Sequence, residues 1–296
     1  MKKEIKIKIE SEKLNIKDYL EQQCSFSSRK IKALLKNKRV LINGKVAYWD
    51  NSIKNEDILI IDLSETGKDS TIPEDMSIEV IYEDEYFLAV NKSAGMLVHP
   101  TQNHPNGTLA NGIKHYFINK GLDIPIRFAN RIDMDTSGIV VLAKSGEAHA
   151  KLSAQFDQAG CEKYYVALAE GTFMVKNGSI DKPIGIDEEN PIRRAVREGG
   201  QRSITQYEVL EQYALAALLR LKLMTGRTHQ IRVHLSSLGH PLLGDKLYGG
   251  KDELIARQAL HACEMVFTHP FGKEIIRLEA PLPDDMKKLI NKFKNS

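Results

Sequence analysis

The chain has 296 residues, of which 42% are hydrophobic and 27% charged, with a formal net charge of +3. This composition is that of a globular protein with room for two domains. Three widely spaced cysteines without a Cys-x-x-Cys pair argue against a disulfide framework and a zinc site. No apolar stretch approaches the roughly 18 residues of a membrane span, and the first residues alternate charged and apolar side chains unlike a signal peptide. A cytoplasmic location is therefore expected.

Basic residues gather near the N-terminus. Residues 1–63 contain 14 Lys and Arg against 9 Asp and Glu, whereas the remainder contains 28 against 30. Such a surplus is expected either for a module that binds a polyanion or for a solvated basic face. The polar segment 64–75, which contains a glycine and a proline, predicts a linker between this module and a larger body at 76–296.

The N-terminal module is predicted to be a strand, two helices and a hairpin. Asn15 can cap the first helix, and the second helix spans 29–36. An Asn-Gly pair at 43–44 between apolar runs predicts the hairpin. On the second helix one face carries Ile31, Leu34 and Leu35, and the opposite face carries Arg29, Lys32 and Lys36.

This order of features, a basic helix followed by Val-x-Ile-Asn-Gly-Lys, resembles the small alpha-L RNA-binding domain first recognised in a ribosomal protein. The resemblance covers residues 12–63. It implies that the module at 1–63 contacts RNA and that the basic helix face, with Arg29, Lys32 and Lys36, supplies phosphate contacts.

The body contains more strands than helices. Strands are predicted near 78–82, 86–91, 138–144, 163–169, 203–210 and 215–224, and helices near 146–157, 227–238 and 283–293. There is no regular alternation of strand and helix. The pattern therefore predicts an α+β fold with a mostly antiparallel mixed central sheet, not a doubly wound parallel sheet.

The segment 131–138, Arg-Ile-Asp-Met-Asp-Thr-Ser-Gly, lies just before the apolar run 139–143. It combines carboxylates and an arginine in a tight polar loop against a buried strand, where a catalytic carboxylate can be held rigidly. It resembles the Arg-Leu-Asp-x-x-Thr-Ser-Gly signature of the RluA/RluD family of RNA pseudouridine synthases. In that family the aspartate is catalytic, which implies this role for Asp133. Asn130 departs from the histidine that usually precedes the arginine.

Four further segments resemble the same family in the expected order. They are 82–100, with Asn-Lys-Ser-Ala-Gly; 163–168, with Lys-Tyr-Tyr-Val-Ala; 225–234, with Gly-Arg-Thr-His-Gln-Ile-Arg; and 240–262. The resemblance runs over 82–270 and implies the pseudouridine synthase fold, with the aspartate loop in a cleft of the sheet. Ser93 departs from the proline that usually follows the lysine.

Pseudouridine formation breaks the glycosidic bond of uridine, turns the uracil and rejoins it through carbon. The reaction needs an ionised carboxylate beside the anomeric carbon, as nucleophile or as stabiliser of an oxocarbenium-like state. The resemblance implies that Arg232 forms the ion pair with Asp133, with Arg227 as the competitor for that role. It also implies that Tyr165 stacks on the uracil and that Arg131 fills the gap left by the flipped base.

Other residues are expected to bind substrate without taking part in the chemistry. Arg193 and Arg194 lie with Arg197 and Arg202 in a glycine-containing segment, which is interpreted either as an RNA-phosphate contact loop or as an ordinary solvated loop. No cofactor and no metal are expected, because the isomerisation is redox-neutral and no phosphate-binding or metal motif is evident. The chain is expected to act as a monomer.

Two other functions remain as alternatives to the isomerase. A non-catalytic RNA-binding ribosome-assembly factor would have no chemical reason to keep Asp133, Tyr165 and Arg232. A hydrolase that uses Asp133 with Asp135 is disfavoured, because residues two apart on an extended segment lie only about 7 Å apart. For the isomerase, large-subunit ribosomal RNA is the expected substrate and transfer RNA the alternative.

Overall fold

The computed structural model describes residues 4–10, 13–24, 26, 28–62, 71–157 and 160–295, without the side chain of Arg29. The chain divides into two compact units, Met1–Gly67 and Lys68–Ser296. Most of the expected linker at 64–75 falls outside the described residues. None of the described helices combines the length and the apolar character that crossing a membrane requires.

The N-terminal unit is a small α/β fold. Its strands are β1 (Glu4–Lys8), β2 (Leu14–Asn15), β3 (Val40–Ile42), β4 (Lys45–Val46), β5 (Ser52–Ile53) and β6 (Ile58–Asp62), and its helices are α1 (Ile16–Gln22) and α2 (Ser28–Lys36). Four strands form an antiparallel sheet in the order β1-β6-β3-β4, and β2 pairs with β5.

Local sequence signals account for this unit. The side chain of Asn15 accepts a hydrogen bond from the backbone N–H of Lys17 at 2.8 Å, which caps α1 as predicted. Asn43 and Gly44 both have positive φ and form the predicted β3–β4 turn. For five of the six residues named in the predicted division of α2 the structure agrees: Ile31, Leu34 and Leu35 are buried, and Lys32 and Lys36 are exposed.

The second unit is built on one large sheet. Its strands are β7 (Glu79–Glu83), β8 (Phe87–Lys92), β9 (Ser137–Ala143), β10 (Cys161–Glu170), β11 (Asn177–Asp181), β12 (Ile184–Ile186), β13 (Arg194–Val196), β14 (Ile204–Gln212), β15 (Ala216–Leu223), β16 (Leu260–Thr268) and β17 (Ile275–Glu279). Its helices are α3 (Leu109–Asn119), α4 (Gly146–Asp157), α5 (Gln230–Ser237) and α6 (Asp284–Lys294), with the short 3-10 helix η1 (Lys246–Tyr248).

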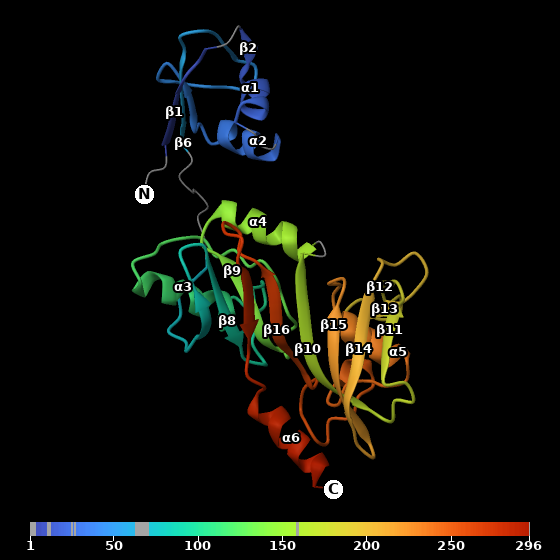
Figure 1. Cartoon of the computed structure of the whole chain (residues 1–296). Helices are drawn as coiled ribbons and strands as arrows, with labels where there is room; N and C mark the ends of the chain where they lie inside the picture. Colours follow the sequence, from blue (N-terminus) through green and yellow to red (C-terminus); the bar gives the residue numbers. More distant parts are fainter. Residues whose placement is uncertain are drawn as a thin grey trace. The chain divides into compact units, whose positions relative to one another are not determined.

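The sheet runs in the order β11-β14-β15-β10-β16-β9-β8-β7, with β17 on β16, and Figure 1 shows its central strands side by side. Strands β9 and β16 are parallel and the other pairs of this sheet are antiparallel. This confirms the predicted mostly antiparallel mixed sheet. Strands β12 and β13 form a separate, short antiparallel hairpin.

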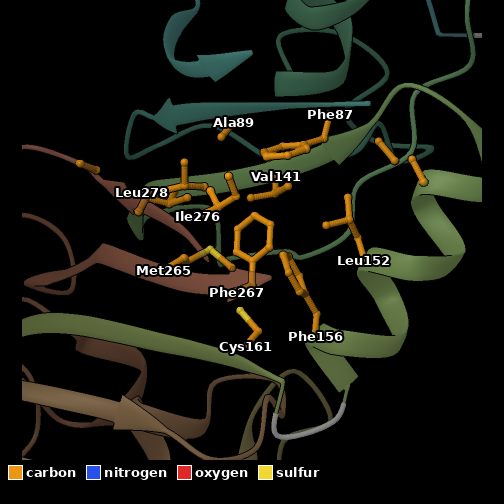
Figure 2. Close-up of a cluster of buried hydrophobic side chains, with 14 residues drawn as sticks. Phe87, Ala89, Val141, Leu152, Phe156, Cys161, Met265, Phe267, Ile276 and Leu278 are labelled. Carbon is orange, nitrogen blue, oxygen red and sulfur yellow. The ribbon is translucent and has the colours of Figure 1, made fainter. Parts of the chain in front are cut away.

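Apolar side chains from β8, β9, β16 and α4 meet on one face of the sheet. In Figure 2, Phe87 from β8, Val141 from β9, Phe267 from β16 and Leu152 and Phe156 from α4 point toward one another. All five are buried. Because β9 is the strand that follows the aspartate loop, this packing holds the strand on which the loop ends.

The sequence did not predict α3 or the strands after residue 259. The segment of α3 contains Asn111-Gly112, a pair typical of turns, yet Thr108 and Asn111 form a capping box that starts a helix there. Gly112 permits close packing, since an added Cβ would lie 2.8 Å from the side chain of Ile78. A local capping signal and close packing at Gly112 therefore outweigh the turn tendency of the Asn-Gly pair.

Candidate active site

The aspartate loop is anchored at both of its ends. At its start, the side chain of Asn130 bonds the backbone of β9, accepting from Val141 at 2.8 Å and donating to Ile139 at 3.2 Å. At its end, Gly138 has φ of +116°, and an added Cβ would lie 2.2 Å from the carbonyl oxygen of Ala262 on β16. Only glycine fits this position, so the loop enters the sheet at one defined place.

The buried side chain of Lys92 bonds the backbone in the middle of the aspartate loop. It is 1% exposed, and its ammonium donates to the carbonyl oxygens of Ser93, Met96 and Met134 at 2.7 to 2.8 Å. Burial lowers the pKa of Lys92 to about 7, against the opposing charges of Asp135 and Asp133. A lysine at the end of β8, just after the apolar run 87–90 and Asn91, is the signal in the sequence for this role.

Asp133 lies beside a buried ion pair. The guanidinium of Arg232 uses Nε and Nη2 to bind both carboxylate oxygens of Asp245, at 2.7 and 2.8 Å. Its remaining Nη1 donates to Oδ2 of Asp133 at 3.1 Å. The side chains of Asp245 and Arg232 are 1% and 8% exposed, while that of Asp133 is 25% exposed. Asp133 is thus the member of the cluster that faces solvent.

The two carboxylates also fix the charge of Arg232. Burial by itself would lower the pKa of this guanidinium, but the hydrogen bonds and charges of Asp245 and Asp133 outweigh it and raise the pKa. The bidentate bond to Asp245 sets the plane of the guanidinium. The structure thus shows the expected contact between Asp133 and Arg232. Arg227, the competitor for this role, is exposed and lies before α5.

A cavity of about 440 Å³ opens at Asp133. Its lining includes Tyr165, Arg131, Arg227, His229 and Arg232. Burial, with the nearby charge of Asp133, raises the pKa of Tyr165, so the phenol stays neutral. Among the described residues nothing bonds the hydroxyl of Tyr165, which leaves it available to a bound molecule.

Three of the four arginines at positions 193–202 lie within ion-pair distance of acids at positions 181–188. Arg193, Arg197 and Arg202 lie 3.5, 2.7 and 4.0 Å from Asp187, Glu188 and Asp181. The guanidinium of Arg194 instead donates to the carbonyl oxygens of Pro191 and Arg193. Both expected RNA contacts, Arg193 and Arg194, are half-buried.

The expected RNA-contacting residues of α2 lie in the N-terminal unit, whereas the cavity lies in the second unit. Lys32 and Lys36 are exposed on α2 as expected, and the side chain of Arg29 lies outside the described residues. Within the part of the chain that the structure describes, no group of three or more His, Cys, Asp or Glu side chains is arranged to hold a metal ion.

The sequence missed three site residues: Lys92, Asp245 and His229. Asp245 falls in the segment 240–262 that carried the resemblance, but only the fold brings it to Arg232. His229 falls in the segment 225–234 that carried the resemblance; its Nε2 lies 3.9 Å from Oδ2 of Asp133 and its ring lines the cavity.

The cavity thus combines a buried arginine, shared between a buried and a solvent-facing aspartate, with a buried tyrosine. The model of the RNA pseudouridylate synthase family matches residues 86–237. The chain belongs to this family. The match spans the sheet from β8 to α5 and therefore includes the aspartate loop, Tyr165 and Arg232.

Relatives with this activity in their names cover nearly the whole chain. YhcT of Bacillus subtilis (strain 168), an uncharacterized RNA pseudouridine synthase, is 42% identical over 88% of this chain and 86% of its own length. Ribosomal large subunit pseudouridine synthase D of Pseudomonas aeruginosa is 33% identical over 90% of this chain and 87% of its own. The solved structure of human RNA pseudouridylate synthase domain containing 1 is 25% identical, with a TM-score of 0.60, and covers 75% of this chain and 97% of that one.

These findings confirm the family predicted from the motifs and the predicted α+β pseudouridine synthase fold. The protein is an RNA pseudouridine synthase, an isomerase that acts on uridine in RNA.

Proposed function

We propose that Asp133 is the catalytic carboxylate of this pseudouridine synthase, with Arg232 as its ion-pair partner and Tyr165 as the residue that contacts the uracil. The observation that carries the proposal is the sharing of Arg232 between two aspartates. Asp245 occupies two nitrogens of the guanidinium, and the third bonds Oδ2 of Asp133. Asp133 is thereby held by a fixed charge while its side chain lines the cavity.

The chemistry follows from this charge arrangement. Two aspartates surround one arginine, so the cluster keeps a net negative charge when all three groups are ionised. That charge favours positive charge on the anomeric carbon when the glycosidic bond breaks. The buried Tyr165 lies in the same cavity, where its ring can stack on the uracil and its neutral phenol can pass a proton.

Arg131 is exposed and lines the same cavity, which supports the role of filling the gap that a flipped base leaves. Arg227 is exposed at the cavity as well, where a phosphate can reach it. In the β12–β13 segment, Arg193 and Arg194 are proposed to contact RNA after exchanging their present partners for phosphate oxygens.

The N-terminal unit is proposed to be an RNA-binding domain at 1–63, joined by a linker at 64–75 to the catalytic domain at 76–296. The exposed Lys32 and Lys36 on one face of α2 support this. Several relatives are named for the ribosomal large subunit, which supports large-subunit ribosomal RNA as the substrate. The free cysteines support a cytoplasmic location, and the protein is proposed to act as a monomer.

The test is pseudouridine mapping by carbodiimide labelling and primer extension on unmodified ribosomal and transfer RNA. Wild-type protein should create a site that Asp133→Asn does not create, while the variant still binds RNA. Asp135→Asn is the matched control, because it removes a carboxylate from the same loop. It should keep most of the activity. Turnover by Asp133→Asn comparable to wild type would overturn the proposed role of Asp133.

The same assay separates the alternatives. A non-catalytic assembly factor would bind RNA without making a site in either RNA class. A hydrolase would release free uracil, and both Asp133→Asn and Asp135→Asn would then lose activity. A site in transfer RNA alone would replace the ribosomal substrate and leave the chemistry unchanged.

A further inference from the structure

His229 has a backbone conformation that few side chains adopt. Its φ of +57° is left-handed, and the residue begins α5 without capping it through its side chain. For a residue other than glycine such a conformation is strained and persists only when its surroundings impose it. Here the result is an imidazole that lines the cavity, with Nε2 3.9 Å from Oδ2 of Asp133.

The other ring nitrogen of His229 ends a hydrogen-bond chain. The backbone N–H of Arg194 on β13 donates to the hydroxyl oxygen of Tyr248 at 2.8 Å. That hydroxyl lies 2.8 Å from Nδ1 of His229. These hydrogen bonds therefore link the β12–β13 hairpin to the cavity at Asp133.

These two hydrogen bonds favour one of the two positions for the proton of His229. A backbone N–H can only donate, so the Tyr248 oxygen accepts from Arg194 and keeps one proton of its own. Within the described part of the protein, Nδ1 of His229 is the one acceptor that the structure places at this hydroxyl. A hydroxyl proton directed at Nδ1 leaves that nitrogen without a proton of its own, so this arrangement favours a neutral ring protonated on Nε2, the nitrogen 3.9 Å from Asp133.

The surroundings favour a neutral imidazole of His229 and fix the position of Tyr248. Burial lowers the pKa of His229; the nearby Arg232 and Arg194 act in the same direction, and the charges of Asp133 and Asp245 oppose them. The ring of Tyr248 is 5% exposed and packs near Ile184 and Val233. The guanidinium carbon of Arg232 lies 5.0 Å from the centroid of that ring.

The reaction gives a reason for a fixed N–H donor at this place. Replacing N1 by C5 at the anomeric carbon requires a half-turn of the uracil about the line through N3 and C6. This turn also exchanges the two carbonyl oxygens, O2 and O4. A donor beside the carbonyl nearest the anomeric carbon in uridine therefore meets the other carbonyl in pseudouridine. A bare ring nitrogen would face a lone pair in both.

We propose that His229 binds the uracil through Nε2–H, donating to the carbonyl oxygen next to the anomeric carbon, and that Tyr248 is a positioning residue that fixes this tautomer from the β12–β13 hairpin. The proposal rests on the proposed role of Asp133, because the donor acts on the same nucleotide. When the glycosidic bond breaks, negative charge develops on the carbonyl oxygens of the uracil. A donor placed there in advance stabilises that charge.

The tautomer is tested first, in the free full-length protein. Proton–nitrogen NMR of protein labelled with ¹⁵N-histidine distinguishes the two ring nitrogens, and His229→Gln identifies the signal of His229. We expect a protonated Nε2 and a bare Nδ1 in the wild type. Tyr248→Phe, which keeps the ring and removes the hydroxyl, should shift a measurable fraction to the other tautomer. An unchanged signal in Tyr248→Phe would overturn the positioning role.

The donor is tested by a matched pair at position 229. Glutamine and methionine have similar length and the same backbone cost, but only glutamine keeps an N–H donor. We expect His229→Met to lower kcat about 100-fold, as loss of a donor to a developing charge does, and His229→Gln to recover most of it. Equal losses in both variants, or a loss confined to KM, would overturn the donor role.

Tyr248→Phe should lower kcat about tenfold, the value of one hydrogen bond, with KM for RNA within about twofold. A rise in KM with kcat unchanged would assign Tyr248 to RNA binding instead and overturn the inference. The outcome is separable from the role of Asp133. Loss of that role would appear as an active Asp133→Asn variant, whereas the NMR measurement does not depend on turnover.

Discussion

The buried charged cluster of Asp133, Arg232 and Asp245 and the exposed arginines Arg131 and Arg227 line one cavity, yet the fold holds them very differently. Arg232 is 8% exposed and makes three charged hydrogen bonds, whereas Arg131 and Arg227 are exposed. Loss of a partner in the buried cluster leaves an uncompensated charge, while an exposed arginine can exchange its partner for water. This difference supports the proposal that the buried cluster takes part in the chemistry and that the exposed arginines contact RNA.

The largest expected effect comes from Arg232→Met. Product formation should fall below detection, and the free energy of unfolding should drop by about 3 to 5 kcal/mol, because Asp245 is left as an unpaired buried charge. Denaturant unfolding and pseudouridine mapping measure the two effects. The double variant Arg232→Met/Asp245→Asn should regain stability but not activity. If the double variant stayed as unstable as the single one, burial of Asp245 would not be the cause.

A half-buried ion cluster outside the cavity, around Glu83, offers a comparison with the buried one. Hydrogen bonds from Lys120, Lys144 and Tyr116 outweigh the opposing effect of burial and lower the pKa of Glu83 to about 2. A carboxyl with a lowered folded pKa stabilises the fold above its usual pKa of 4.5, and this contribution is lost as the pH falls toward 2. Because solvent screens this half-buried cluster, the contribution of Glu83 amounts to roughly 1 to 2 kcal/mol.

Glu83→Gln should therefore be less stable than wild type at pH 6 and approach it at pH 2.5. The nearby exposed Glu85→Gln serves as the control and should follow the wild-type curve. Unfolding free energy measured across this pH range gives the comparison. A constant gap between Glu83→Gln and wild type at all pH values would contradict the assignment.

The basic face of α2 should influence binding without affecting chemistry. Replacing Lys32 and Lys36 by alanine in the full chain should weaken RNA binding and reduce the slope of log affinity against log salt by roughly 1.5. The value of kcat on a short RNA should remain that of wild type. Lys288→Ala, an exposed lysine on α6, is the control. An unchanged salt slope in the double variant would remove α2 from the RNA interface.

The smallest effect is expected for Arg227→Gln at the cavity mouth. One lost phosphate contact should reduce the salt slope by about 1 and raise KM a few-fold, uniformly across RNA sequences. Titration of RNA at several salt concentrations tests this. A fall in kcat of the size expected for Arg232→Met would instead place Arg227 in the catalytic cluster and erase the distinction between the two groups.

Local signals determined much of this protein. The range of α4, 146–157, the cap at Asn15 and the turn at Asn43 follow from neighbouring residues, and the structure confirms them. The motif at 131–138 and the segment 225–234 gave the family, and with it the pairing of Asp133 and Arg232 that the structure shows. These features depend on residues that are close in the sequence or on a recognisable order of motifs.

Tertiary structure alone decided which further side chains meet at the cavity. Asp245 binds Arg232 across a turn, Lys92 reaches Met134 from another strand, and Tyr248 joins His229 to the hairpin. Each contact joins elements that the sheet brings together, and no periodicity or spacing encodes it. Burial then gives these contacts their strength, because a charge or hydroxyl that has left water depends wholly on the partners the fold supplies.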